Sequence, residues 1–212
     1  MTRLLMSGPQ SAVAHMVLAH GAGAPMDSPF LEAIASNLAR HDIATIRFEF
    51  DYMAARRSDG VRRPPPKMDH LAGQFRDVVA AVTVGCGARL FIGGKSMGGR
   101  VASLVADALH EQGLIAGCVG LGYPFHPPKS AQTLRVAHLA TLRCPTLIIQ
   151  GTRDALGNRA DVMGYDLSAS IKLHWLDDGD HDFKPRKASG HTQDGHIKAA
   201  AAAMAAFAAS TV

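Results

Sequence analysis

The stretch Arg89-Leu90-Phe91-Ile92-Gly93-Gly94-Lys95-Ser96-Met97-Gly98-Gly99-Arg100-Val101 decides the fold of this chain. Its apolar run at residues 90–92 predicts a short buried strand, which ends at two glycines. An amphipathic helix pattern begins directly afterwards, with apolar residues every three to four positions from Val101 onward. Between strand and helix lies Gly94-x-Ser96-x-Gly98, the pattern of a nucleophile elbow, in which a serine stands on a sharp turn.

Two other interpretations of this stretch are possible. A phosphate-binding P-loop would need a glycine five residues before Gly94, where Arg89 stands, and a loop between the strand and Lys95. We therefore set the P-loop aside. A glycine-rich turn with an incidental serine remains an alternative, but the strand and the helix around Ser96 favour the catalytic interpretation.

Strands and helices alternate along the rest of the chain. The other predicted strands are at residues 13–19, 43–50, 114–121, 146–150 and 171–176. Helices are predicted to begin near Asp27 or Ser28 and at Asp69, to follow Ser96, and to lie near residues 133–139, 158–167 and 192–209. Residues 51–68, which end in three prolines, are predicted to be irregular.

This alternation predicts one α/β domain over residues 1–212. We expect a mostly parallel, doubly wound sheet of six or seven strands with helices on both faces. In such sheets the functional groups gather at the carboxyl ends of the strands. Partners for Ser96 should therefore follow the later strands.

A serine hydroxyl needs a base within hydrogen-bond reach, and the base needs an orienting acid. Asp154 is the first acid after the strand at residues 146–150, and His181 is the first histidine after the strand at residues 171–176. The order Ser96, Asp154, His181 is the order that this elbow type uses. Asp154 could instead be only a turn residue, and His181 could be solvated or hold a metal weakly in its acidic loop. Three residues that each follow a strand in the right order favour the catalytic interpretation.

The loop after the first predicted strand, His20-Gly21-Ala22-Gly23, is expected to complete an oxyanion hole. Its donors would be the backbone N–H groups of Ala22, with Gly23 as second choice, and of Met97. A dinucleotide-binding G-x-G-x-x-G pattern fails here because Met26 stands in its sixth position. We expect His20 to form structural hydrogen bonds.

Composition narrows the class of protein. With 47% hydrophobic residues and a net charge of only +4, the sequence gives no argument for nucleic-acid binding. No apolar run reaches the ~20 residues of a membrane span. Three widely spaced cysteines (Cys86, Cys118 and Cys144) suit reduced, buried thiols, so we expect a cytoplasmic protein. We expect neither a metal nor an organic cofactor, and the oligomeric state stays open.

From residue 13 to 209 the chain resembles the α/β-hydrolase superfamily. The resemblance rests on His20-Gly21, Gly94-Lys95-Ser96-Met97-Gly98-Gly99, Gly151-Thr152-Arg153-Asp154 and Gly179-Asp180-His181. It is similar to a small group without a cap, near the dienelactone hydrolases, and to a subgroup with relatives in testis-expressed protein 30 and a subunit of a histone-acetylation complex. The resemblance implies a hydrolase fold but no defined substrate.

The arginine-rich segment at residues 51–68 should emerge on the same side of the sheet as Ser96. It could be a solvated loop or an anion site, and we assign Arg56, Arg57 and Tyr123 to substrate binding. The sequence thus predicts a serine esterase or thioesterase acting on a small acyl substrate. The alternative is an interaction module that binds an acidic partner through this segment.

Overall fold

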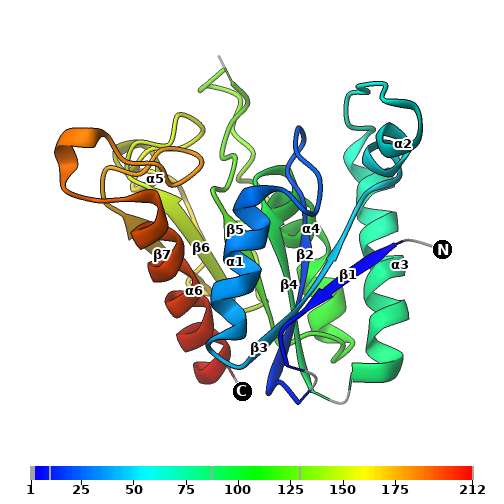
Figure 1. Ribbon diagram of the computed structural model, residues 1–212. Coiled ribbons are helices and arrows are strands. Elements are labelled where there is room, and N and C mark those ends of the chain that lie inside the picture. The colour runs from blue at the N-terminus through cyan, green and yellow to red at the C-terminus, as the bar shows by residue number, and fades with distance from the viewer. Residues whose placement is uncertain (1–2, 10, 87, 129, 212) are drawn as a thin grey trace.

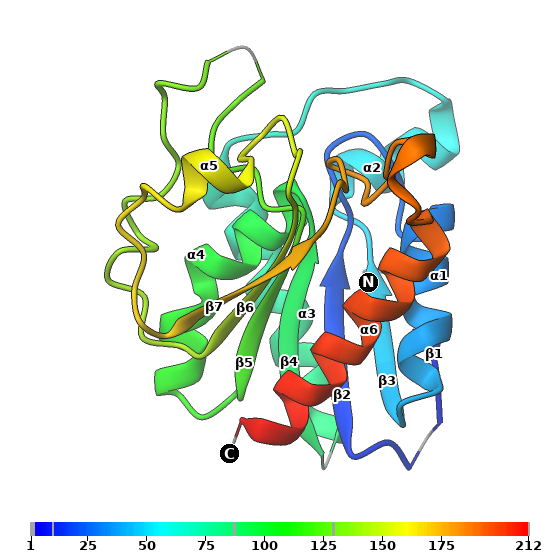
Figure 2. The same ribbon diagram turned by 90° about the vertical axis from the view of Figure 1, so that its left-hand side faces the viewer.

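The computed structural model describes residues 3–9, 11–86, 88–128 and 130–211. For residues 83–86 it describes the backbone only. Within this part of the chain seven strands form one sheet in the order β1-β3-β2-β4-β5-β6-β7, as Figures 1 and 2 show. The strands are β1 (Leu4–Ser7), β2 (Ala14–Ala19), β3 (Ile43–Phe48), β4 (Arg89–Lys95), β5 (Gly117–Leu121), β6 (Thr146–Gly151) and β7 (Ile171–Leu176). β2 to β7 pair in parallel, which confirms the predicted α/β sheet.

β1 is the strand that the sequence pattern did not predict. It pairs antiparallel with the edge of β3, from Leu4 opposite Phe48 to Ser7 opposite Thr45. Its side chains alternate between exposed and half-buried positions, and Met6 remains 66% exposed. A four-residue edge strand carries too short an apolar pattern to be recognised in the sequence.

Helices cover both faces of the sheet, as expected. The helices are α1 (Pro29–Ala39), α2 (Asp51–Asp59), α3 (Met68–Cys86), α4 (Met97–Glu111), α5 (Arg159–Val162) and α6 (Gln193–Ser210). A separate hydrophobic cluster packs on each face of the sheet. One contains Phe75 of α3 and Val105 of α4, and the other contains Ile34 of α1 and Met204 of α6. Figure 2 shows α1 and α6 together on one side of the sheet.

Helix starts follow the predicted signals in two places. α1 begins after Ser28 with Pro29 as its first residue, where the missing N–H of proline costs nothing. α6 begins after Thr192, whose hydroxyl accepts the Gly195 N–H at 3.0 Å. Both helix starts are therefore determined by local sequence.

The prediction that residues 51–68 are irregular is wrong in its first half. Asp51–Asp59 forms α2, which buries Tyr52 and Met53 and ends at Gly60 with a φ of 72°. A glycine in the left-handed region is a common way to end a helix. The prolines at residues 64–66 do interrupt regular structure, and α3 begins shortly after them at Met68.

Two further helix predictions are corrected. Residues 133–139 form no helix but an irregular segment that ends in a turn, and the Arg135 N–H donates to the Phe125 carbonyl at 2.7 Å. The helix expected at residues 158–167 is limited to Arg159–Val162, and the Gly164 N–H closes it onto the Asp161 carbonyl. In the first of these places a contact with another segment prevails over helix propensity, and in the second a local turn ends the helix early.

The described residues contain no helix that is long and apolar enough to cross a membrane. Cys118 and Cys144 are buried free thiols, and the side chain of Cys86 lies outside the described part of the structure. The loops that follow β2, β6 and β7 all lie at the upper edge of the sheet in Figure 1. This edge is where the candidate site forms.

Candidate active site

Ser96 stands on a strained turn between β4 and α4. Its backbone has φ 51° and ψ −114°, a conformation that a residue with a side chain rarely adopts. The Ser96 N–H donates to the Leu121 carbonyl at 2.9 Å, which holds the turn against the end of β5. This strained strand-to-helix turn is the geometry of a nucleophile elbow.

The glycines on either side of Ser96 let the elbow pack against β2. A Cβ on Gly94 would overlap the Ala19 carbonyl oxygen, and a Cβ on Gly98 would overlap the same oxygen and that of His20. Backbone atoms cannot give way as a flexible side chain can. The G-x-S-x-G spacing is therefore required by the close approach of the main chains.

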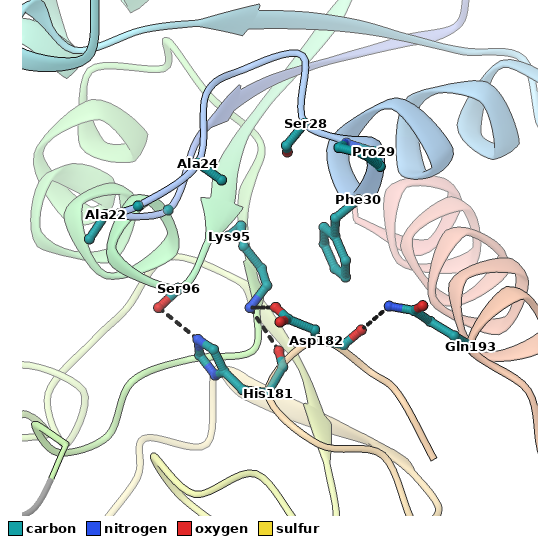
Figure 3. Close-up of a pocket in the computed structure, with 12 residues that line it drawn as sticks. Ala22, Ala24, Ser28, Pro29, Phe30, Lys95, Ser96, His181, Asp182 and Gln193 are labelled. Atoms are coloured by element: carbon teal, nitrogen blue, oxygen red, sulfur yellow. Dashed lines mark hydrogen bonds and ion pairs between the residues drawn. The ribbon is translucent and has the colours of Figure 1, made fainter. Parts of the chain in front are cut away.

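His181 follows β7 and reaches both other predicted residues. Its Nε2 lies 2.9 Å from the Ser96 Oγ, and its Nδ1 lies 2.8 Å from the Asp154 Oδ2. An ionised carboxylate only accepts hydrogen bonds, so it favours the tautomer with hydrogen on Nδ1 and leaves Nε2 to accept the serine hydroxyl. Figure 3 shows the imidazole turned toward Ser96 at the rim of a pocket.

Asp154 is fully buried just after β6, and its carboxylate is surrounded by donors. Besides His181, the Gln150 Nε2 donates to Oδ2 at 2.9 Å and the Leu156 N–H donates to Oδ1 at 2.8 Å. Buried carboxylates are stable as anions only when hydrogen-bonded in this way. The structure thus places Ser96, His181 and Asp154 in one continuous chain of hydrogen bonds.

Gln150 has a supporting position that the sequence analysis missed. Its Oε1 accepts the Tyr123 N–H at 2.6 Å, while its Nε2 contacts Asp154 and the carbonyls of Tyr123 and Gly157. The side chain thereby ties the loop after β5 to the loop that carries Asp154. A signal was present, because Gln150 is an amide at the end of the otherwise apolar run at residues 147–149.

The loop after β2 is held by side chains from α2. The Tyr52 hydroxyl donates to the Ala22 carbonyl at 3.0 Å, and the Arg56 guanidinium donates to the Gly23 carbonyl at 3.2 Å. Burial raises the pKa of Tyr52 to about 12, so its hydroxyl remains a donor. The N–H groups of Ala22 and Met97 have no hydrogen-bond partner among the described residues.

His20 has the structural role that was expected. Its Nε2 accepts the Phe50 N–H at 3.2 Å, so its hydrogen is on Nδ1, which donates to the Gly21 carbonyl at 2.6 Å. Burial lowers the pKa of His20, which keeps the ring neutral. The ring therefore fixes the entrance to the loop that contains Ala22.

A pocket of about 540 Å³ opens beside Ser96. Its walls come from the loop after β2, the start of α1, the elbow, the His181 loop and the start of α6, and twelve residues line it (Gly21, Ala22, Gly23, Ala24, Ser28, Pro29, Phe30, Lys95, Ser96, His181, Asp182 and Gln193), as Figure 3 shows. Ser96 and His181 thus face a space that a small molecule can enter.

The acidic loop around His181 is occupied by internal contacts. Asp178 pairs with Arg186 at 2.5 Å and with Arg153 at 3.5 Å. Asp180 accepts the backbone N–H groups of Asp182 and Lys184. Among the described residues no three His, Cys, Asp or Glu side chains are grouped to hold a metal ion.

Two residues predicted to bind substrate have internal partners in the structure, and their role in substrate binding stays a prediction. The Arg57 guanidinium donates to Glu49 at 2.7 Å and pairs with Asp27 at 2.6 Å, so two carboxylates of the protein already bind it. Tyr123 is 1% exposed, and its hydroxyl lies 3.2 Å from Ser103 Oγ, away from the pocket. These pairings depend on how the segments fold together, which the sequence pattern could not show.

Arg56 likewise has an internal contact. It binds the Gly23 carbonyl and is not among the residues that line the pocket. Its position supports the loop around Ala22 rather than a ligand. Substrate binding by Arg56 stays a prediction.

Comparison with known proteins agrees with the fold. The solved structures that the chain resembles include dienelactone hydrolase from Anabaena variabilis, with 20% identity, a TM-score of 0.72, and 100% and 92% of the two chains covered. An α/β serine hydrolase homologue from Coxiella burnetii has 14% identity, a TM-score of 0.71, and 96% and 89% coverage.

A third solved structure is XC6422 from Xanthomonas campestris, described as an α/β serine hydrolase without a lid. It has 20% identity, a TM-score of 0.66, and 85% and 80% coverage. At these identities the likeness concerns the fold. The family model for the alpha/beta hydrolase domain matches residues 12–209, nearly the whole chain. The chain therefore belongs to the alpha/beta hydrolase family.

Proposed function

We propose that this protein is a serine hydrolase that cleaves a carboxylic ester or a related acyl bond. The observation that carries the proposal is the hydrogen-bonded chain Ser96–His181–Asp154 at the rim of an open pocket. A serine on a strained elbow, a base at 2.9 Å and a buried acid behind the base are the parts that nucleophilic acyl transfer needs.

In the acylation step, Ser96 Oγ attacks the carbonyl carbon of the substrate while its proton moves to His181 Nε2. The tetrahedral intermediate then expels the alcohol or thiol, which takes the proton from Nε2 as it leaves. Asp154 keeps the hydrogen on Nδ1 and stabilises the imidazolium that exists between these two transfers. The product of this step is an acyl ester on Ser96.

Water completes the reaction by the same path. His181 Nε2 removes a proton from the water, whose oxygen attacks the acyl carbon and releases Ser96 with its proton restored. During both steps the negative oxygen would be held by the N–H groups of Ala22 and Met97. Among the described residues neither N–H group has a hydrogen-bond acceptor, which supports this assignment. The position of Met97 at the start of α4 also supports it.

Structural relatives favour this reaction class. They include Est1E from Butyrivibrio proteoclasticus, which was solved with ferulic acid, and a monoacylglycerol lipase from Paleococcus ferrophilus. For this chain we propose a small acyl substrate, since the pocket beside Ser96 is open and has a volume of about 540 Å³. A single domain over residues 1–212 and a cytoplasmic location stay predictions.

The interaction-module alternative is less well supported. Within the segment at residues 51–68, Arg57 pairs with Glu49 and Asp27, and Arg63 pairs with Asp59 at 2.6 Å. Guanidinium groups that already have carboxylate partners are poor sites for an acidic partner.

Turnover of a graded panel of substrates tests the proposal. p-Nitrophenyl acetate, butyrate and octanoate and one acyl thioester should be compared at equal concentration with the wild type and with Ser96→Ala. We expect hydrolysis by the wild type, with a preference that identifies the bond and the acyl length. Ser96→Ala should be inactive but folded, and a Ser96→Ala protein with wild-type turnover would contradict the proposal.

A further inference from the structure

Lys95 is a buried cation directly before Ser96. Its side chain is only 9% exposed, and its Nζ donates to the His181 carbonyl oxygen at 2.7 Å. The same Nζ lies 3.2 Å from Asp182 Oδ1 and 5.3 Å from the centre of the Phe30 ring. Figure 3 shows the lysine reaching from the elbow to the loop that carries the imidazole.

The sheet topology shows how far the His181 loop travels to meet Lys95. β4, which ends at Lys95, is separated by β5 and β6 from β7, which the His181 loop follows. The loop therefore returns across the ends of β6 and β5 to the elbow, where Ser96 contacts the imidazole and Lys95 contacts the backbone of the same residue. The contact joins residues 86 positions apart in the chain.

Burying this ammonium has a cost. Desolvation lowers the pKa of Lys95, and the negative charge of Asp182 opposes that change. Asp182 is itself 67% exposed, so water screens its attraction. A methionine would fill the same space without the desolvation cost, so the cation is not explained by packing alone.

The contact between Lys95 and the His181 carbonyl leaves no room for a side chain at Gly122. It has a φ of 61°, and a Cβ at this position would lie 2.8 Å from the His181 carbonyl oxygen and 3.1 Å from Lys95 Nζ. The same point is 3.4 Å from His181 Nδ1. The ammonium, the carbonyl and the imidazole of the base therefore meet beside one glycine.

We propose that Lys95 is a positioning residue for His181, holding the backbone of the base so that its ring stays between Ser96 and Asp154. This inference rests on the proposed hydrolase function. The main effect is on geometry, because small displacements of a catalytic group can cost up to about 100-fold in rate.

Three carboxylates surround this cation: Asp182, Asp154 and Asp180 supply negative charge around Lys95. Asp182 is the one that lies within ion-pair distance of Nζ, at 3.2 Å. The effect of this ion pair therefore has to be separated from that of the hydrogen bond to the His181 carbonyl.

The test uses Lys95→Met, which keeps length and volume, with Lys184→Met as the matched control on an exposed lysine of the same loop. Hydrolysis of p-nitrophenyl acetate is measured from pH 5 to 10, with circular dichroism and thermal unfolding as checks of folding. We expect Lys95→Met to lose about 10- to 100-fold in kcat with little change in KM.

Asp182→Asn separates the two contacts of the lysine. It removes the carboxylate but leaves the Lys95–carbonyl hydrogen bond, so its loss in kcat should be smaller than that of Lys95→Met. An equal loss would overturn the proposal in favour of the ion pair. Lys95→Gln, which is too short to reach the carbonyl, replaces Lys95→Met if that variant does not fold.

Failure of the inference is distinguishable from failure of the proposed function. If the wild type hydrolyses the ester and folded Lys95→Met keeps its kcat, Lys95 does not position the base. If the wild type itself hydrolyses none of the esters in the panel, the hydrolase proposal fails first.

Discussion

The contact between Gln150 and Asp154 allows a quantitative prediction. Gln150→Glu replaces the amide nitrogen that stands 2.9 Å from Asp154 Oδ2 with an oxygen of nearly the same size. Two negative charges at this distance repel by about 6 kcal/mol at an effective dielectric constant of ~20. This energy corresponds to about four pK units for the new carboxyl group.

The sign of the pH dependence follows from that shift. The new carboxyl has a folded-state pKa raised above its unfolded value of about 4.3, so the folded protein binds the extra proton more tightly. Stability is therefore retained at low pH and lost as the pH rises from about 4.3 to about 8. The difference in unfolding free energy between variant and wild type should grow by ~1.4 kcal/mol per pH unit in this window.

Urea denaturation at pH 5, 6, 7 and 8 measures this difference. Gln132→Glu, on an exposed turn, is the matched control and should run parallel to the wild type. A Gln150→Glu curve that also runs parallel to the wild type would refute the reasoning. It would mean that the amide does not face an ionised Asp154.

Three further predictions concern the same site and its surroundings. Asp154→Asn should leave His181 in the wrong tautomer and reduce kcat by up to ~10⁴-fold in the ester assay, and a loss below tenfold would point to another acid. Gly94→Ala places a Cβ against the Ala19 carbonyl oxygen and should cost about 3 kcal/mol in thermal or urea unfolding, whereas a wild-type midpoint would show that the main chains can separate. Burial, reinforced by the positive charge of Arg100, lowers the pKa of His138 to about 4, so its contribution to stability is complete above about pH 6.5 and is lost as the pH falls toward 4. His138→Gln should therefore reduce the loss of unfolding free energy in that range, and an unchanged pH dependence would exclude His138 as its source.

The sequence was sufficient where a local pattern carries the structural information. Buried apolar runs that end at glycine identified β4 and β6, because a strand buried on both faces needs a continuous apolar segment. Ser96, Asp154 and His181 were selected because each is the first residue of its type in the loop or turn after a predicted strand. The parallel topology then brings the ends of distant strands to one edge of the sheet.

The sequence was insufficient where a residue depends on a partner far away in the chain. Arg57 looked available for an anion until the fold placed Glu49 and Asp27 beside it. α2 has few apolar residues, and burial of Tyr52 against the Ala22 loop helps to explain why it forms. Lys95 stood inside the decisive motif, but its contact with the His181 loop exists only in three dimensions.

The most direct test of the central claim is covalent labelling of Ser96 with a fluorophosphonate. The account predicts one phosphonyl adduct per folded wild-type chain, located on the peptide that contains Ser96 by mass spectrometry. His181→Ala should react far more slowly, because the serine then lacks its base. An unlabelled, folded wild-type protein, or an adduct on a different serine, would contradict the assignment of Ser96 as the nucleophile.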